Sequence, residues 1–80
     1  MVDKKILSYL EAIKPSFWNQ SPDWRDLKLR HILDSLDMLE FITYLENTFA
    51  IKIKDQDVVS RNFETVDSTI NFVNRMCQRD

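Results

Sequence analysis

The sequence predicts a small all-α protein, a three-to-four-helix bundle with a long first loop. Its three longer apolar patterns, in residues 2–14, 35–49 and 65–78, repeat every three to four residues, as in a helix with one buried face. Eighty residues form one domain, 1–80, with a single small core. Residues 50–55 alternate as a strand does, but no second strand is available to pair with them. We therefore expect an extended loop there that buries Ile51 or Ile53.

The first helix is predicted over residues 2–14. Pro15 ends it, because the residue before a proline is pushed out of helical geometry. The side chains expected on its inner face are Val2, Ile6, Leu7, Tyr9, Leu10 and Ile13. This pattern indicates a scaffold helix.

The connection over residues 15–33 is long for a compact domain, and such a loop is usually either tied to the core or functional. Residues 21–24 suit a turn or the start of a short helix. Apolar side chains supply the tethers: Phe17, Trp18, Trp24, Leu27, Leu29, Ile32 and Leu33. For the two tryptophans, packing is favoured over stacking on a cofactor.

The central helix begins at Asp34-Ser35-Leu36-Asp37. Asp34 is the predicted N-cap, and Asp37 stands at the capping-box position. Ser35 is then expected in the first turn with its hydroxyl near solvent. A helical count to Phe49 turns Met38, Phe41, Ile42, Leu45 and Phe49 inward and Leu36, Glu40, Thr43 and Asn47 toward water, with Asp37 and Glu46 at the edges. Leu36 is either an ordinary exposed leucine or a partner contact, and its acidic surroundings favour a contact.

The last third of the chain predicts a minor helix and a longer one. Asp55 is expected to cap one or two helical turns, and Phe63 is expected in the core. Thr65 is predicted to cap a helix that runs to about Gln78. The inner stripe of this helix is Val66, Ile70, Val73 and Cys77, with Phe72 and Met76 alongside. Cys77 is either a packing residue or a thiol at a frayed helix end.

Composition argues against several function classes. A formal net charge of −2 supplies no basic surface for nucleic acid. No apolar run is long enough to span a membrane, and the first residues lack the apolar core of a signal peptide, so we expect a cytoplasmic monomer. One cysteine cannot form an internal disulfide, and one cysteine with one histidine cannot make a metal site by themselves.

A hydrolase with Ser35 as nucleophile and His31 as base is a distant alternative. It would also need a third group that orients the base and an oxyanion site, and the chain has no glycine to shape a tight loop. His31 is therefore expected to be a surface residue, which can still tune how a partner recognises Ser35.

The segment that begins at Asp34 resembles the signature of the acyl carrier protein family, Asp-Ser-Leu followed by a helix with spaced acidic and apolar residues. The matching positions are Asp34, Ser35, Leu36, Asp37, Glu40, Glu46, Phe49 and Ile53. The resemblance covers most of the chain, including the length of the first loop. The chain departs from the family pattern at Ile32, where carriers often have glycine, and at Lys52 and Lys54, where many fatty-acid carriers are more acidic.

The resemblance implies an acyl-carrier-protein-like fold and a carrier, not an enzyme. A phosphopantetheinyl transferase that uses magnesium would attach 4′-phosphopantetheine covalently to Ser35, and the thiol of this arm would hold an acyl, aminoacyl or polyketide cargo as a thioester. Loading ligases and synthase or transferase enzymes would then contact Asp34, Leu36, Asp37, Leu39, Glu40, Thr43 and Glu46. Fatty-acid, polyketide and nonribosomal peptide biosynthesis all use such carriers, and the departures favour a dedicated pathway. The alternative is a small helical protein–protein interaction module that is never modified.

Overall fold

Helices make up the regular structure of the residues that the structure describes. The computed structural model describes residues 2–15, 24–59 and 61–78. The elements in these ranges are α1 (Val2–Ile13), the 3₁₀ helices η2 (Trp24–Asp26) and η3 (Leu29–His31), α2 (Ser35–Phe49), α3 (Asp55–Val58), the 3₁₀ helix η4 (Arg61–Phe63) and α4 (Val66–Cys77). The predicted small all-α fold is confirmed. The predictions for Phe17, Trp18, residues 21–23 and the side chain of Trp24 lie outside the described part of the chain.

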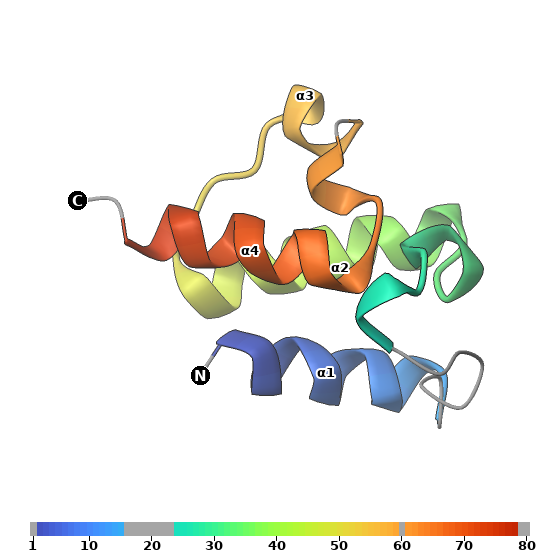
Figure 1. The fold of residues 1–80 in the computed structure, drawn as a ribbon. Helices are drawn as coiled ribbons and strands as arrows, with labels where there is room; N and C mark the ends of the chain where they lie inside the picture. Colours follow the sequence, from blue (N-terminus) through green and yellow to red (C-terminus); the bar gives the residue numbers. More distant parts are fainter. Residues whose placement is uncertain (1, 16–23, 60, 79–80) are drawn as a thin grey trace.

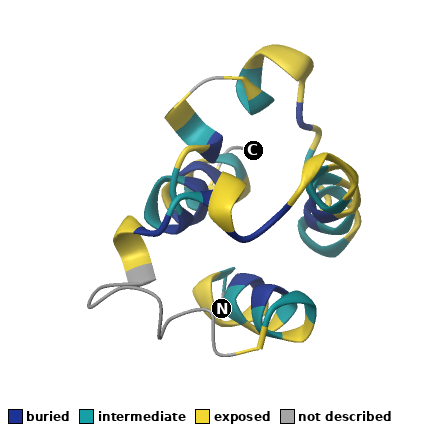
Figure 2. Cartoon of the chain, turned by 90° about the vertical axis from the view of Figure 1, so that its right-hand side faces the viewer, coloured by how far each residue is buried: buried dark blue, intermediate teal, exposed yellow. Residues whose placement is uncertain are grey.

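The three long helices, α1, α2 and α4, form the bundle, and the short α3 lies to one side of it (Figure 1). Figure 2 views the molecule from one end and shows the buried stretches of these helices turned toward a common centre. The fully buried side chains come from all three helices and from η3: Ile6, Leu10, Leu29, Phe41, Leu45, Val66, Thr69 and Val73.

The first connection is tied down as predicted. Its four apolar tethers after residue 26 are all buried: Leu27, Leu29, Ile32 and Leu33. The backbone adds an interaction that the sequence did not predict, an isolated antiparallel β-bridge between Lys28 and Thr65. The Leu29 N–H donates to the Glu64 carbonyl at 3.0 Å, and the Val66 N–H donates to the Leu27 carbonyl at 3.0 Å. The end of the connection is thereby fixed to the start of α4.

The turn after α2 uses an unusual backbone conformation. Ala50 adopts the left-handed helical region, with φ 55° and ψ 45°, and it is the one residue in the described ranges with a positive φ. Its N–H donates to the Glu46 carbonyl and so closes the helix. The chain then runs extended, with Ile53 buried and Ile51 half-buried. The expected extended loop is confirmed.

Two local predictions are wrong. The N-cap of α3 is Lys54, not Asp55, because the backbone N–H of Lys54 is satisfied by the Asp57 carboxylate at 3.2 Å, one turn into the helix. Cys77 does not belong to the inner stripe of α4, because the buried part of this helix ends at Val73; its thiol is exposed at the last residue of the helix, which agrees with the alternative of a thiol at the helix end. Thr65 does cap α4: its Oγ1 accepts a hydrogen bond from the Ser68 N–H at 3.0 Å.

Candidate functional site

Ser35 is the first residue of α2, and its side chain is exposed, as predicted. The residue before it, Asp34, has an extended backbone and accepts a hydrogen bond from the Asp37 N–H on Oδ1 at 2.8 Å. This bond satisfies one of the N–H groups that the first turn of any helix leaves unpaired. Asp34 is therefore the N-cap of α2, and Ser35 follows it as the first residue of the helix.

A shallow hollow of about 320 Å³ lies beside the Ser35 side chain. It is lined by Arg30, Leu33, Asp34, Ser35 and Met38. Leu33 is buried and Met38 half-buried, whereas Arg30 is exposed. The serine hydroxyl thus opens to solvent next to an apolar wall and a guanidinium group.

Two large apolar side chains on α2 face solvent. Leu36 is 66% exposed and Leu39 is 63% exposed. Glu40 and Thr43 are exposed as well, and the spacing of these four residues places them on one face of the helix. Four of the predicted partner-binding residues therefore form one continuous surface that starts next to Ser35.

The three acidic residues of α2 that were predicted to contact partners, Asp37, Glu40 and Glu46, are not equally exposed. Glu40 is exposed, whereas Asp37 and Glu46 are half-buried at the edges of the solvent face. The Glu46 carboxylate accepts a hydrogen bond from the Ile53 N–H at 2.9 Å, which holds the extended segment after α2 against this helix. Sequence spacing does not reveal this contact, because the chain between the two residues is not a continuous helix.

Tyr9 of α1 packs on aromatic rings of α2, a contact that the sequence did not predict. Its ring stacks on Tyr44, with centroids 4.3 Å apart, and on Phe41, with centroids 5.4 Å apart. Burial raises the pKa of the Tyr9 hydroxyl above its ordinary value of 10.0, and the charges of Glu40 and Asp37 raise it further. Helical periodicity assigned Tyr9 to an inner face, but it cannot show which helix that face meets.

His31 lies four residues before Ser35, and its side chain forms no hydrogen bond with the serine. Its side chain is exposed, and its backbone carbonyl accepts a hydrogen bond from the Lys14 Nζ at 3.2 Å. His31 and Ser35 both lie within the described ranges, and no hydrogen bond joins their side chains. The residue of η3 that lines the hollow with Ser35 is Arg30. The geometry therefore gives a nucleophile–base pair no support.

The described residues show neither a metal-ligand cluster nor a membrane-spanning helix. These residues contain no group of three or more histidine, cysteine, aspartate or glutamate side chains that could hold a metal ion. Across residues 2–15, 24–59 and 61–78, no helix has both the length and the apolar character needed to cross a membrane. Comparison with family models, curated proteins and solved structures finds no match for this chain.

Proposed function

We propose that this protein is a carrier protein with an acyl-carrier-protein-like fold, in which Ser35 accepts a 4′-phosphopantetheine arm. The observation that supports it most is the exposure of Ser35 as the first residue of a capped helix, within the motif Asp34-Ser35-Leu36. A transferase can reach a hydroxyl in this position without unfolding the helix. The long helix and the solvent-facing leucines that follow suit an acceptor that is presented to other enzymes.

The residues around Ser35 are compatible with a phosphodiester. A negative charge is favoured at a helix N-terminus, where N–H groups are unpaired and the helix dipole is positive. Arg30 supplies a cation in the adjoining hollow, and Leu33 and Met38 supply its apolar wall. Asp34 opposes the added charge, but one of its oxygens is held by the Asp37 N–H. When bound, the arm supplies a thiol that holds an acyl or aminoacyl cargo as a thioester.

Attachment forms one bond and breaks one. The Ser35 Oγ attacks the phosphorus next to the pantetheine portion of coenzyme A, a new O–P bond forms, and the bond to the second phosphate breaks to release adenosine 3′,5′-bisphosphate. The hydroxyl proton passes to a base of the transferase, which also binds the magnesium ion. This chain contributes the orientation and exposure of Ser35, and His31 has no part in the step.

The surface next to Ser35 suits brief contacts with several enzymes. Leu36 and Leu39 offer apolar area at its centre, and Glu40 offers a negative charge to basic partners. Exposed ion pairs contribute about 0–1 kcal/mol each and chiefly raise encounter rates. A loading ligase and the synthase or transferase enzymes that use the cargo are the partners of this surface.

The first test is the intact mass of the protein after incubation with coenzyme A, magnesium and a broad-specificity phosphopantetheinyl transferase. We expect a mass gain of one phosphopantetheine, which is lost in Ser35→Ala. Ser8→Ala, which removes another exposed serine, is the matched control and should still gain the group. Absence of a gain with both this enzyme and the host's own transferase would contradict the proposal.

An unmodified interaction module is the second candidate function. The exposure of Leu36 and Leu39 favours it, since these side chains can bind a partner whether or not Ser35 is modified. The mass experiment separates the two candidates, because only the carrier requires a covalent change on Ser35.

A further inference from the structure

Among the described residues, Arg30 is the one cation that borders the hollow beside Ser35. The volume of this hollow, about 320 Å³, is at the lower end of the range for small-molecule sites. Arg30 belongs to η3 and Ser35 begins α2, so two elements meet there. A group bonded to the Ser35 hydroxyl therefore starts within a small space that the Arg30 side chain also borders.

The backbone of Arg30 is held next to the start of α2. The Ile32 N–H donates to the Leu29 carbonyl at 2.9 Å, and the Leu33 N–H donates to the same carbonyl at 2.8 Å. The chain thus turns directly before Asp34. Leu29 and Leu33 are buried, which anchors this turn in the core. The Arg30 side chain is exposed and can adjust to a neighbouring anion.

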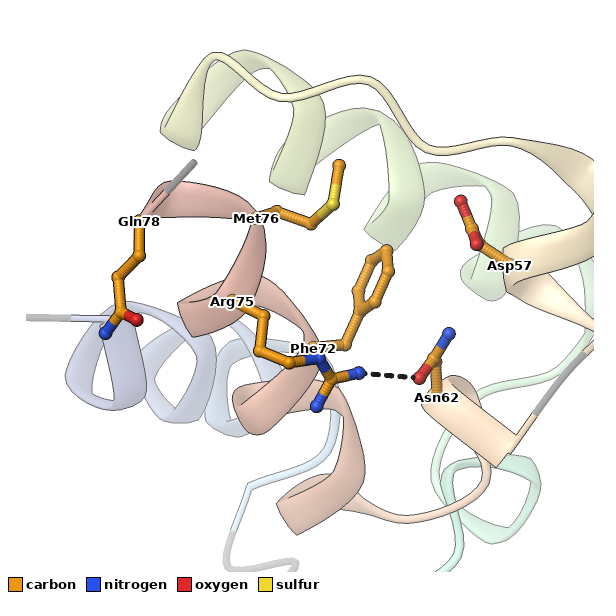
Figure 3. Close-up of a pocket in the computed structure, with 6 residues that line it drawn as sticks. All are labelled: Asp57, Asn62, Phe72, Arg75, Met76 and Gln78. Atoms are coloured by element: carbon orange, nitrogen blue, oxygen red, sulfur yellow. Dashed lines mark hydrogen bonds between the residues drawn. The ribbon is translucent and has the colours of Figure 1, made fainter. Parts of the chain in front are cut away.

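Two other arginines of the described part already have partners. Arg25 pairs with Asp67 at 3.5 Å. Arg75, in the hollow of about 600 Å³ drawn in Figure 3, donates from Nη2 to the Asn62 Oδ1 at 3.0 Å. Arg30 forms no ion pair or side-chain hydrogen bond with another described residue. Its planar set of N–H donors is therefore available to the oxygens of a phosphodiester.

Two neighbours of Ser35 on α2 define two directions in which a group attached to Ser35 can lie. Residues three and four positions further along a helix flank the same starting residue, so Met38 lies on one side of Ser35 and Leu39 on the other. Met38 lines the hollow together with Arg30, whereas Leu39 does not. Met38 is half-buried and still presents part of its side chain to solvent. The cation therefore lies on the Met38 side.

We propose that Arg30 is a positioning residue that holds the phosphodiester on Ser35 toward Met38. This inference rests on the proposed carrier function. The arm then starts on the Met38 side of α2, with the methyl groups of its pantoyl part, which are close to the phosphate, against the Met38 side chain. Leu36 and Leu39 stay uncovered, so a partner can dock on them without first displacing the arm.

The test is an NMR measurement on the protein with the arm attached and with ¹³C-labelled methionine and leucine methyl groups. In wild type, nuclear Overhauser effects from the pantoyl methyl groups should be stronger to Met38 than to Leu39. Arg30→Gln should lower the ratio of these two intensities about two- to fivefold, the size expected for one exposed ion pair. Arg30→Lys should keep part of the ratio, because it retains the charge but not the planar set of donors.

Two controls accompany these variants. Arg61→Gln removes another exposed arginine that does not line the hollow, and it should keep the wild-type ratio. Added salt should lower the ratio in wild type toward that of Arg30→Gln, which tests the contact without any substitution. Equal ratios in wild type and Arg30→Gln, or a stronger effect to Leu39 than to Met38 in wild type, would overturn the proposal.

Intact mass on the same samples separates this inference from the carrier function. Each protein is modified to completion before the NMR measurement. If wild type gains no phosphopantetheine, the carrier function and the positioning role are both wrong. If the gain occurs and the intensity ratio does not depend on Arg30, only the positioning role is wrong.

Discussion

Tyr9 joins α1 to α2 through its stacked ring, and its hydroxyl has a raised pKa. In the folded protein the neutral phenol persists to higher pH than in the unfolded chain, so unfolding releases a proton in that range. The stabilisation is therefore complete below pH 10 and is lost as pH rises through the higher pKa of the folded state.

We expect the stability of the wild-type protein to fall more steeply above pH 10 than that of Tyr9→Phe, which retains the stacked ring without the ionisable group. Urea unfolding at a series of pH values from 8 to 11.5 measures the difference. Parallel curves for the two proteins above pH 10 would show that Tyr9 contributes nothing to this dependence.

Leu36 and Leu45 allow the stability effect of an exposed leucine to be compared with that of a buried one on the same helix. Because its side chain is 66% exposed, Leu36→Ala should change the free energy of unfolding by no more than about 0.5 kcal/mol. Leu45 has the same side chain fully buried on the same helix, and Leu45→Ala should cost about 2–5 kcal/mol. Chemical denaturation gives both values. Leu36→Ala should instead slow loading by a partner ligase, and a large loss of melting temperature would show that Leu36 packs in the core.

The hydrogen bond between the Glu46 carboxylate and the Ile53 N–H holds the segment after α2, and substitutions of Glu46 test its contribution to stability. Removing its carboxylate in Glu46→Ala leaves the partly buried Ile53 N–H without its partner, which should cost about 1–3 kcal/mol. Glu46→Gln keeps an acceptor oxygen at the same place and should cost less. Urea unfolding compares the two variants, with Glu40→Ala as the exposed control. If the alanine and glutamine variants were equally stable, the hydrogen bond would not contribute to the free energy of unfolding.

Element boundaries were predictable where a local signal fixes them. Asp34 and Thr65 mark the starts of α2 and α4, because their side chains accept N–H groups of the first turn. Pro15 follows the end of α1, because a proline restricts the backbone of the residue before it. The N-cap of α3 was misplaced because Lys54 has no side-chain acceptor that would mark it as a cap in the sequence, and its N–H instead donates to the Asp57 carboxylate. The placement of Cys77 on the inner stripe was wrong, because the apolar periodicity continues along α4 after the core beside it has ended.

In the candidate site, too, the features that depend on local sequence were predictable and the contacts between separate segments were not. The exposure of Ser35 and Leu36 follows from the cap and the helical count, both of which are local. The hollow with Arg30, the stacking of Tyr9 and the contact between Glu46 and Ile53 all depend on how separate segments meet. A single sequence carries no direct signal for such contacts.

The charge of the whole molecule is nearly balanced, so its distribution matters more than its sum. Glu40→Lys reverses the exposed charge on α2 and should weaken loading by the cognate ligase at low ionic strength while leaving the fold intact. Added salt screens exposed charges, so the difference from wild type should shrink as salt rises. Asp26→Lys makes the same change on exposed η2 and is the control. Unchanged loading kinetics of Glu40→Lys at low salt would contradict the prediction.

The parts of this molecule are attached to one another in two different ways, and the β-bridge between Lys28 and Thr65 is an example of the first. It joins the first connection to α4 through backbone hydrogen bonds, whereas no backbone pair in the described ranges joins α1 to another element. α1 is attached through packed side chains and the bond from the Tyr44 hydroxyl to the Lys5 carbonyl. Partial unfolding events release the least connected unit first. α1 should therefore detach and return while the Asp34 cap of α2 stays formed, and the amide protons of α1 should exchange with solvent faster than those of α4.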